Sequence, residues 1–272
     1  MRHCLPFLLL VLALLRPDVA AARVVQIATG ELPPYATESR TDKGVALQIV
    51  RRAFALAGHE VRFHFMPWSR AQLETKAGLW DASAYWGASD QRRRDFLLSD
   101  TVLVEQWQLV SLRELKLDWQ KLEDLGAWRI GVIRDYTYTP EFWRLVQTGR
   151  LQADNTTDDL AGLRKLLLRR IDVLPIERNV ACDLLARHFS QAEAAQLAIH
   201  PRLLTESFTT HLLLPPQLPR SQTLLQDFNR GLRQLISSGE HARIMTSVSC
   251  PLGWTPRPAP QDPATTGTRQ TP

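Results

Sequence analysis

A cation and a small polar side chain follow directly after an apolar stretch that is typical of a buried strand. The stretch is residues 79–86, LWDASAYW, and Ser89 and Arg92 come after it. In α/β proteins ligands bind beyond the carboxyl ends of the strands, so these two side chains lie at a candidate site. The planar guanidinium of Arg92 can bind a carboxylate through two parallel hydrogen bonds. The alternative interpretation is that Arg92, in a run of three arginines, is a solvated loop charge.

A second candidate position precedes a predicted helix. Tyr136 and Thr137 follow the apolar strand 129–133, and Thr139 with Pro140 forms a typical helix start. Backbone N–H groups and a hydroxyl at such a place can receive a carboxylate. An ordinary turn would explain the same residues, and both interpretations stay open.

Other chemistries lack support in the sequence. The histidines are scattered, no cysteine pair has metal-ligand spacing, and neither a nucleophile triad nor a phosphate-binding loop is present, so we expect no metal and no cofactor. The formal net charge of +5 is modest and spread along the chain, which argues against nucleic-acid binding. Cys182 and Cys250 can form a disulfide or remain two buried thiols.

The two ends of the chain differ in composition from the middle. Residues 1–22 have a basic start, a short apolar run and three alanines at the end, which is typical of a cleaved secretory signal and predicts a secreted protein. The apolar run is too short to cross a membrane. Residues 255–272 are rich in proline and threonine and are predicted to be disordered.

Between these ends, strand and helix patterns alternate in two successive sets. The first helix signal covers residues 44–58, and a second, short helix is predicted from Ser69 to Gly78. A long helix over residues 221–238 follows the second set. Alternation of this kind predicts an α/β fold of mainly parallel sheets flanked by helices, and two sets predict two lobes with a ligand cleft between them.

Several motifs, in this order, resemble those of the bacterial extracellular solute-binding proteins of family 3, which have the type II periplasmic-binding-protein fold. Those motifs are Gly78 and Asp81 (G-x-x-D-A), Ser89 to Arg92 with Phe96 and Ser99, residues 128–133 (K-x-I-G-V), residues 170–172 (G-R-I-D), and Phe228, Asn229 and Gly231 with Gly239 (F-N-x-A-L, then G). The resemblance runs over nearly all of the chain after residue 22. It implies a first lobe of residues 23–112 plus 212–254, and a second lobe of residues 113–211.

The resemblance also implies roles for individual residues. Arg92 lies where the family binds the ligand carboxylate, and Glu177 where amino-acid binders carry the acid for the ammonium group. Tyr35 and Trp68 resemble the aromatic walls that clamp the ligand. Each has an ordinary alternative: Glu177 suits a helix start, and aromatic residues after prolines often pack loops.

The chain departs from the family pattern in two places. The first helix lacks the acids of G-F-D-x-D, and the glycine, serine or threonine run after the second lobe's first strand is replaced by residues 134–138, RDYTY. A bulkier loop there reshapes the carboxylate pocket, so the expected ligand is a small polar compound, an amino acid or a relative of one.

The resulting prediction is a monomeric periplasmic binding protein that closes two lobes on its ligand and serves an ABC-type permease or a membrane sensor. Two alternatives from other classes remain. One is a periplasmic dehydratase of the cyclohexadienyl type, with Glu177 as the acid that protonates a leaving hydroxyl. The other is a sensory or docking module without tight ligand binding.

Overall fold

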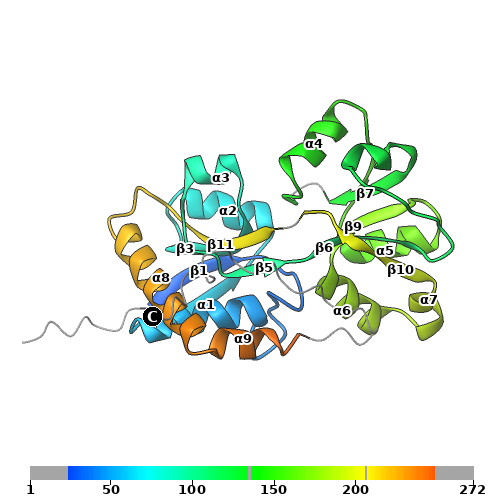
Figure 1. Cartoon of the computed structure of the whole chain (residues 1–272). Helices are drawn as coiled ribbons and strands as arrows, with labels where there is room; N and C mark the ends of the chain where they lie inside the picture. Colours follow the sequence, from blue (N-terminus) through cyan, green and yellow to red (C-terminus); the bar gives the residue numbers. More distant parts are fainter. Residues whose placement is uncertain (1–23, 134–135, 206, 249–272) are drawn as a thin grey trace, which may run out of the picture.

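The computed structural model describes residues 24–133, 136–205 and 207–248. The predicted signal segment 1–22 and the predicted tail 255–272 lie outside the described residues. Within the described residues, the strands form two separate sheets, each with its own helices, and two crossing segments connect the sheets (Figure 1). We call each sheet with its helices a lobe.

The sheet of the first lobe has the strand order β2-β1-β3-β11-β4, with β5 also paired to β11. β1 is parallel to β2 and β3, whereas β11 is antiparallel to β3, β4 and β5. The strands are β1 (Val24–Thr29), β2 (Glu60–Phe65), β3 (Ala82–Gly87), β4 (Leu97–Leu98), β5 (Leu103–Glu105) and β11 (Phe208–Leu214).

Helices cover both faces of this first sheet. Ile27 of β1 packs in one apolar cluster with Phe54 of α1 and Phe228 of α8, while Ala28 packs in another with Ala71 of α2. Alternate residues of the strand therefore face opposite helical layers. The helices are α1 (Val45–Leu56), α2 (Trp68–Lys76), α3 (Asp90–Asp95), α8 (Ser221–Ser237) and α9 (Glu240–Met245).

One glycine brings α1 and α8 into close contact. A Cβ atom on Gly231 of α8 would lie 1.9 Å from the carbonyl oxygen of Ala53 in α1. Since real Cβ contacts are much longer, only glycine permits this approach between the two helices.

The sheet of the second lobe has the order β10-β6-β9-β7-β8, with β7 parallel to β8 and β9 and with β6 antiparallel to β9 and β10. Leu174 of β9 packs with Leu163 of α5 on one face, and Ile130 of β7 packs with Phe142 of α4 on the other. The elements are β6 (Trp107–Leu112), the 3-10 helix η1 (Leu122–Ala127), β7 (Arg129–Ile133), α4 (Pro140–Gln147), β8 (Gln152–Thr156), α5 (Asp159–Leu167), β9 (Val173–Glu177), α6 (Arg178–His188), α7 (Gln191–Ala195) and β10 (Leu197–Leu203).

The chain passes between the lobes at two places that lie next to each other. Gln106 alone separates β5 in the first sheet from β6 in the second, and residues 204–207 separate β10 from β11. Glu105 is paired with Phe208, so the two crossings are neighbours. The family resemblance implied that residues 107–112 belong to the first lobe and that this lobe resumes at residue 212. In the structure, residues 107–112 form β6 of the second sheet, and β11 of the first sheet begins at Phe208.

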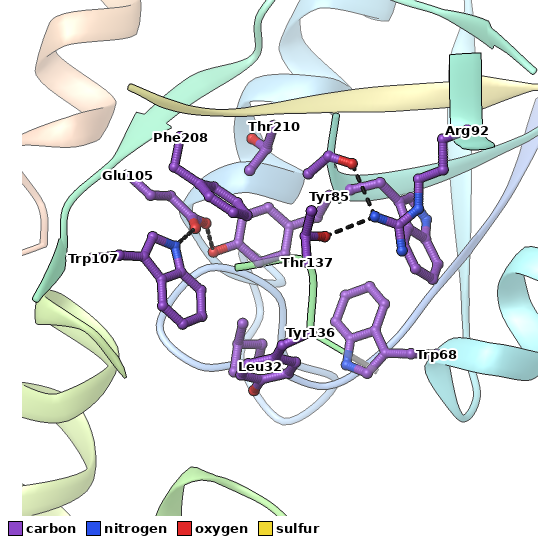
Figure 2. A pocket seen from close by; sticks show the side chains of 12 residues that line it. Leu32, Trp68, Tyr85, Arg92, Glu105, Trp107, Tyr136, Thr137, Phe208 and Thr210 are labelled. Carbon is purple, nitrogen blue, oxygen red and sulfur yellow. Dashed lines mark hydrogen bonds between the residues drawn. The ribbon is translucent and has the colours of Figure 1, made fainter. Parts of the chain in front are cut away.

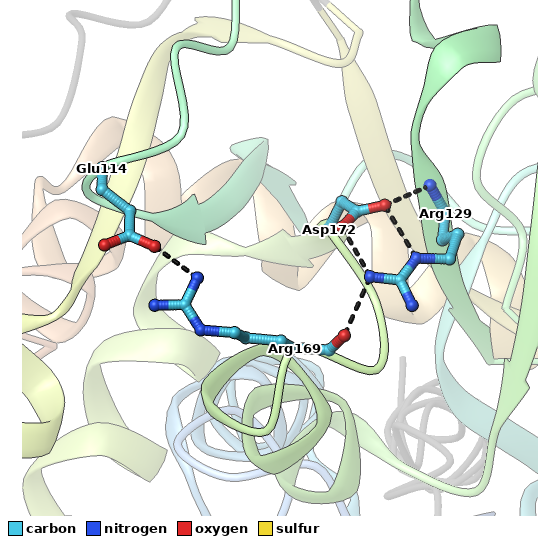
Figure 3. Close-up of polar contacts among 4 residues, drawn as sticks. All are labelled: Glu114, Arg129, Arg169 and Asp172. Carbon is cyan, nitrogen blue, oxygen red and sulfur yellow. Dashed lines mark hydrogen bonds and ion pairs between the residues drawn. The ribbon is translucent and has the colours of Figure 1, made fainter.

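Ion pairs join residues at the ends of β6, β7 and β9 in the second lobe (Figure 3). Arg129, at the start of β7, donates from its guanidinium to both oxygens of Asp172 at 3.0 and 2.8 Å and to the carbonyl oxygen of Arg169 at 2.8 Å. Arg169 in turn forms an ion pair with Glu114. All four side chains are at least partly exposed, and each is already paired with another of the four. This cluster therefore stabilises the second lobe.

No helix in the described part of the chain has the length and apolar character needed to cross a membrane. Cys182 of α6 is buried and disulfide-bonded, and Cys250 lies outside the described residues.

Candidate functional site

A cavity of about 60 Å³ lies between the two lobes, beside the crossing segments (Figure 2). Both lobes contribute to its wall, with strand residues next to both crossings, and half of the lining residues are aromatic. The lining residues are Leu32, Trp68, Tyr85, Trp86, Gly87, Arg92, Glu105, Trp107, Tyr136, Thr137, Phe208 and Thr210. A cavity of this size holds a few water molecules or a small group of a ligand, so the lobes are nearly closed on each other.

The carboxyl end of β3 forms the centre of the wall. β3 ends at Gly87, which pairs with Thr210 of β11. Side chains from the opposite lobe and from the second crossing come so close that a Cβ atom on Gly87 would lie 2.9 Å from Thr137 Oγ1 and 2.6 Å from Phe208 Cζ. Because Gly87 has no side chain, Thr137 of the second lobe can approach the end of β3.

Arg92 reaches the cavity from the helix that follows. Ser89 caps α3 by accepting a hydrogen bond from the Arg92 backbone N–H at 3.2 Å. The guanidinium then lies over the ring of Trp86, 4.6 Å from its centroid, in a cation–π contact. The helix cap and the Trp86 ring together orient the Arg92 side chain toward the cavity.

The hydrogen bonds of Arg92 go to neutral acceptors only. Nε donates to Gln72 Oε1 at 2.9 Å, and Nη1 donates to Gly87 O at 3.0 Å and to Thr137 Oγ1 at 2.8 Å. No ion pair with Arg92 occurs in the described part of the chain. Burial lowers the pKa of Arg92 to about 10, so it is still a cation at neutral pH. A largely buried guanidinium whose acceptors are all neutral has the chemistry to bind an anionic group.

An acid faces the same cavity from the first crossing. Glu105 is only 4% exposed; Tyr85 donates its hydroxyl to Oε1, and Trp107 donates its indole N–H to Oε2 at 2.6 Å. Burial, followed by the charge of nearby Glu177, raises the pKa of Glu105 to about 8. At neutral pH Glu105 is therefore mostly protonated.

Tyr85 lies between Arg92 and Glu105 and has an unusual backbone conformation (Figure 2). Its φ is 70°, in the left-handed region that bulky residues rarely adopt. The ring of Tyr35 stacks on it at 5.4 Å. Because such strain persists only where packing over-determines it, the conformation indicates a site that orients Tyr85 and its hydroxyl toward Glu105.

Four of the seven residues proposed from the sequence line the cavity. Trp68 begins α2 and packs edge to face on Trp86, with ring centroids 5.2 Å apart. Its indole fits because Gly30 has no side chain: a Cβ there would lie 2.2 Å from Trp68 Cε2. Tyr136 and Thr137 come from the loop before α4, and Arg92 completes the set.

The other three, Tyr35, Ser89 and Glu177, do not line the cavity. Tyr35 is 1% exposed behind Tyr85, and its hydroxyl accepts a hydrogen bond from Asn179 at 2.7 Å across the lobes. Glu177 is buried and caps α6, where it accepts from the backbone N–H groups of Asn179 at 2.7 Å and Val180 at 3.0 Å. Ser89, as the cap of α3, acts on the site only through Arg92.

Sequence reasoning missed Glu105, Trp107 and the β11 residues. A signal for Glu105 exists: it is a single acid inside the apolar run 102–112. Phe208 and Thr210 carry no such signal, since their place at the cavity follows from the pairing of β11 with β3 and β5. No group of three or more metal-ligating side chains occurs among the described residues.

Comparison with known proteins identifies the family. Residues 25–247 match the bacterial extracellular solute-binding proteins, family 3, and the chain belongs to this family. No curated protein sequence matches it.

Solved structures share the fold at low sequence identity. An ancestral arginine-binding protein bound to arginine is 15% identical with a TM-score of 0.67, over 83% of this chain and 97% of that one. A histidine kinase sensor domain with similarity to periplasmic binding proteins is 19% identical with a TM-score of 0.68, over 84% and 96% of the two chains. The ligand-binding core of GluR0 from Nostoc punctiforme, in complex with L-glutamate, is 14% identical with a TM-score of 0.66, over 84% and 100%. The chain therefore has the two-lobed fold of type II periplasmic binding proteins.

Proposed function

We propose that this protein captures a small polar ligand with a carboxylate group, an amino acid or a related compound, by closing its two lobes. The observation that carries the proposal is Arg92, a largely buried cation in the interlobe cavity whose hydrogen-bond acceptors are all neutral. Neighbouring structures that hold arginine or glutamate support the ligand class. Trp68, Tyr136 and Thr137 would form the wall around the ligand.

The proposal includes a cellular role. After removal of residues 1–22 the protein would act in the periplasm as a monomer, and it would deliver its ligand to an ABC-type permease or present it to a membrane sensor. Membership of a family of extracellular binding proteins supports secretion, and the similar sensor domain supports a signalling use of the same fold.

A thermal-shift screen of the purified protein against amino acids, polyamines, small organic acids and short peptides tests the binding function. A ligand at a hundredfold excess over its dissociation constant stabilises the folded state by about 2.7 kcal/mol. The shift should disappear in Arg92→Ala, because loss of a buried charge that pairs with the ligand costs about 2–5 kcal/mol of binding. The matched control is Arg93→Ala, an exposed arginine in the same helix. An unchanged affinity in Arg92→Ala would remove Arg92 from the site.

A second candidate is a dehydratase of the cyclohexadienyl type, favoured by one observation. Glu105 faces the cavity and, with a pKa of about 8, carries a proton at neutral pH that it can donate to a leaving hydroxyl. The sequence had pointed to Glu177 for this role, but Glu177 caps a helix outside the cavity. Turnover of arogenate or prephenate by the purified protein would support this candidate, and its absence would exclude it.

A further inference from the structure

A buried hydroxyl on the wall of the cavity has no hydrogen-bond partner. Thr210 lies on β11 and is 2% exposed, and its Oγ1 has no partner among the residues that the structure describes. It lines the cavity between the lobes (Figure 2). Because buried side-chain hydroxyls are normally hydrogen-bonded, this atom indicates a place for a polar group that is not part of the chain.

Two neighbouring strands hold Thr210 in position. It pairs with Gly87 of β3 on one side and with Leu103 of β5 on the other. Its carbonyl oxygen accepts a hydrogen bond from the backbone N–H of Val102 at 2.8 Å. The hydroxyl is therefore presented by the rigid centre of the first sheet.

The strand register places this hydroxyl on the part of the wall that Arg92 also reaches. Residues paired across antiparallel strands point their side chains to the same face of a sheet, so Thr210 faces the side on which Gly87 meets Thr137. The carbonyl oxygen of Gly87 accepts a hydrogen bond from Arg92 Nη1 at 3.0 Å. A ligand carboxylate bound by Arg92 would thus lie with the carbon next to it near Thr210.

Arg92 and Thr137 keep donors for such a carboxylate. Arg92 makes its hydrogen bonds through Nε and Nη1, and within the described residues Nη2 makes none. Thr137 Oγ1 accepts from Arg92 at 2.8 Å, which leaves the hydrogen of its own hydroxyl to donate. The carboxylate can accept from both groups, while Thr210 is left for a different part of the ligand.

The buried acids beside the cavity are covered by donors of the chain itself. The Tyr85 hydroxyl donates to one oxygen of Glu105, and the indole of Trp107 donates to the other at 2.6 Å. The Tyr136 hydroxyl donates to Asp159 at 2.5 Å. The polar group that the wall leaves unsatisfied is a neutral hydroxyl, which can give one hydrogen bond and accept others. It matches a hydroxyl or carbonyl group better than an ammonium group, whose three protons and charge require more acceptors.

We infer that Thr210 determines the specificity of the cavity by forming a hydrogen bond with a neutral hydroxyl or carbonyl group next to the ligand's carboxylate. The ligand is then a 2-hydroxy or 2-oxo carboxylic acid. The inference rests on the proposed function, which it deepens: Arg92 binds the carboxylate, and Thr210 selects the substituent beside it.

Isothermal titration calorimetry with propionate, L-lactate, pyruvate and L-alanine tests this selection, since these compounds differ only at the carbon next to the carboxylate. A second series of 3-phenylpropionate, L-3-phenyllactate, phenylpyruvate and L-phenylalanine adds a ring for the aromatic wall. In at least one series we expect the hydroxy or oxo acid to bind about tenfold more tightly than the unsubstituted acid, as one added hydrogen bond allows. The amino acid should bind no more tightly than the unsubstituted acid.

Variants of β11 assign the preference to one hydroxyl. Thr210→Val should weaken binding of the hydroxy or oxo acid about tenfold and leave the unsubstituted acid nearly unchanged, whereas Thr210→Ser, which keeps the hydroxyl, should preserve the preference. Thr209→Val is the matched control: Thr209 is the next residue of the same strand, faces the opposite side, and bonds through its Oγ1 to His211 Nε2 at 2.8 Å. A merely structural role of Thr210 would weaken all the acids alike.

The outcomes separate the inference from the proposed function. Equal affinities for substituted and unsubstituted acids in both series would overturn the inference, since the Thr210 hydroxyl would then bind only water. Tighter binding of the amino acids, or an equal loss for every acid in Thr210→Val, would also overturn it; in each case the binding function stands. If neither these acids nor any compound of the thermal-shift screen binds, the inference falls together with the binding function. Should Thr210→Val fail to fold, the order of affinities in the wild-type protein decides.

Discussion

Arg92 donates a hydrogen bond from Nη1 to Thr137 Oγ1 at 2.8 Å, and this bond joins the first lobe to the second across the cavity. The same guanidinium is proposed to hold the ligand carboxylate. The contact between the lobes and the proposed ligand contact would therefore share one guanidinium.

We predict that Thr137→Val opens the ligand-free protein. Valine has the shape of threonine without the hydroxyl, so Arg92 loses an interlobe acceptor, and hydrogen bonds to charged groups contribute about 1.5–3 kcal/mol. Small-angle scattering should show a larger radius of gyration. Thr210→Val is the control, because the Thr210 hydroxyl has no protein partner in the described residues. Equal radii for wild type and Thr137→Val would show that this bond does not hold the lobes.

The buried acids should make the protein less stable as the pH rises. The pKa values of Glu105 and Asp159 are raised to about 8 and about 7, mainly by burial, and that of Glu177 is also raised. From about pH 5 to pH 7 the folded state keeps protons that the unfolded chain has released. The free energy of unfolding should fall by up to about 1.4 kcal/mol per pH unit for each group.

Urea unfolding at a series of pH values measures this slope. Glu105→Gln should flatten it by one group's share between about pH 5 and pH 7. Asp42, whose pKa is lowered to about 2 chiefly by its hydrogen bond with Arg40, acts in the opposite direction but only at more acidic pH. A stability that rises from pH 5 to pH 7 would contradict the prediction.

Gly231→Ala should destabilise the first lobe. The new methyl group would meet the Ala53 carbonyl oxygen, and overpacking of this kind costs about 1–3 kcal/mol. Gln234→Ala, at an exposed position of the same helix, is the matched control and should leave the urea midpoint nearly unchanged. If both variants unfold at the same midpoint, α1 and α8 can move apart at little cost.

Glu177→Ala should lower stability more than it lowers ligand affinity. Glu177 caps α6 through two backbone N–H groups, and loss of an N-cap costs about 0.5–2 kcal/mol. Glu177→Asp, which can keep the cap, is the comparison variant. Denaturation and calorimetry on the same samples separate the two effects; a large loss of affinity with unchanged stability would place Glu177 at the ligand.

Local signals predicted much of the fold. Thr139 caps α4 as the Thr-Pro pair indicated, and the strand at 129–133 forms as expected. The predicted helix from Ser69 begins one residue earlier, at Trp68, and Pro67 precedes it in the N-cap position.

The site was predicted less completely, for a physical reason. Trp68, Arg92, Tyr136 and Thr137 follow strands or precede helices, and such positions can be read from periodicity. Glu105 lies at the cavity because the chain passes from the first sheet to the second directly after it. This crossing depends on the long-range pairing of β5 with β11. Short strands such as β5 and β8 were missed for the same reason, since they carry little pattern of their own.

The single residue between β5 and β6 has a mechanical consequence. Glu105 and Trp107 lie on either side of Gln106 and line the cavity at this pivot, while Figure 2 shows Arg92 on the far side of Tyr85 from Glu105. A group that fits between the side chains at the pivot acts with a short lever arm: a small displacement there produces a large swing of the far ends of the lobes. If the lobes close on a ligand as proposed, bulk near Glu105 would set the angle of closure, and contacts at Arg92 and Thr137 would hold that angle.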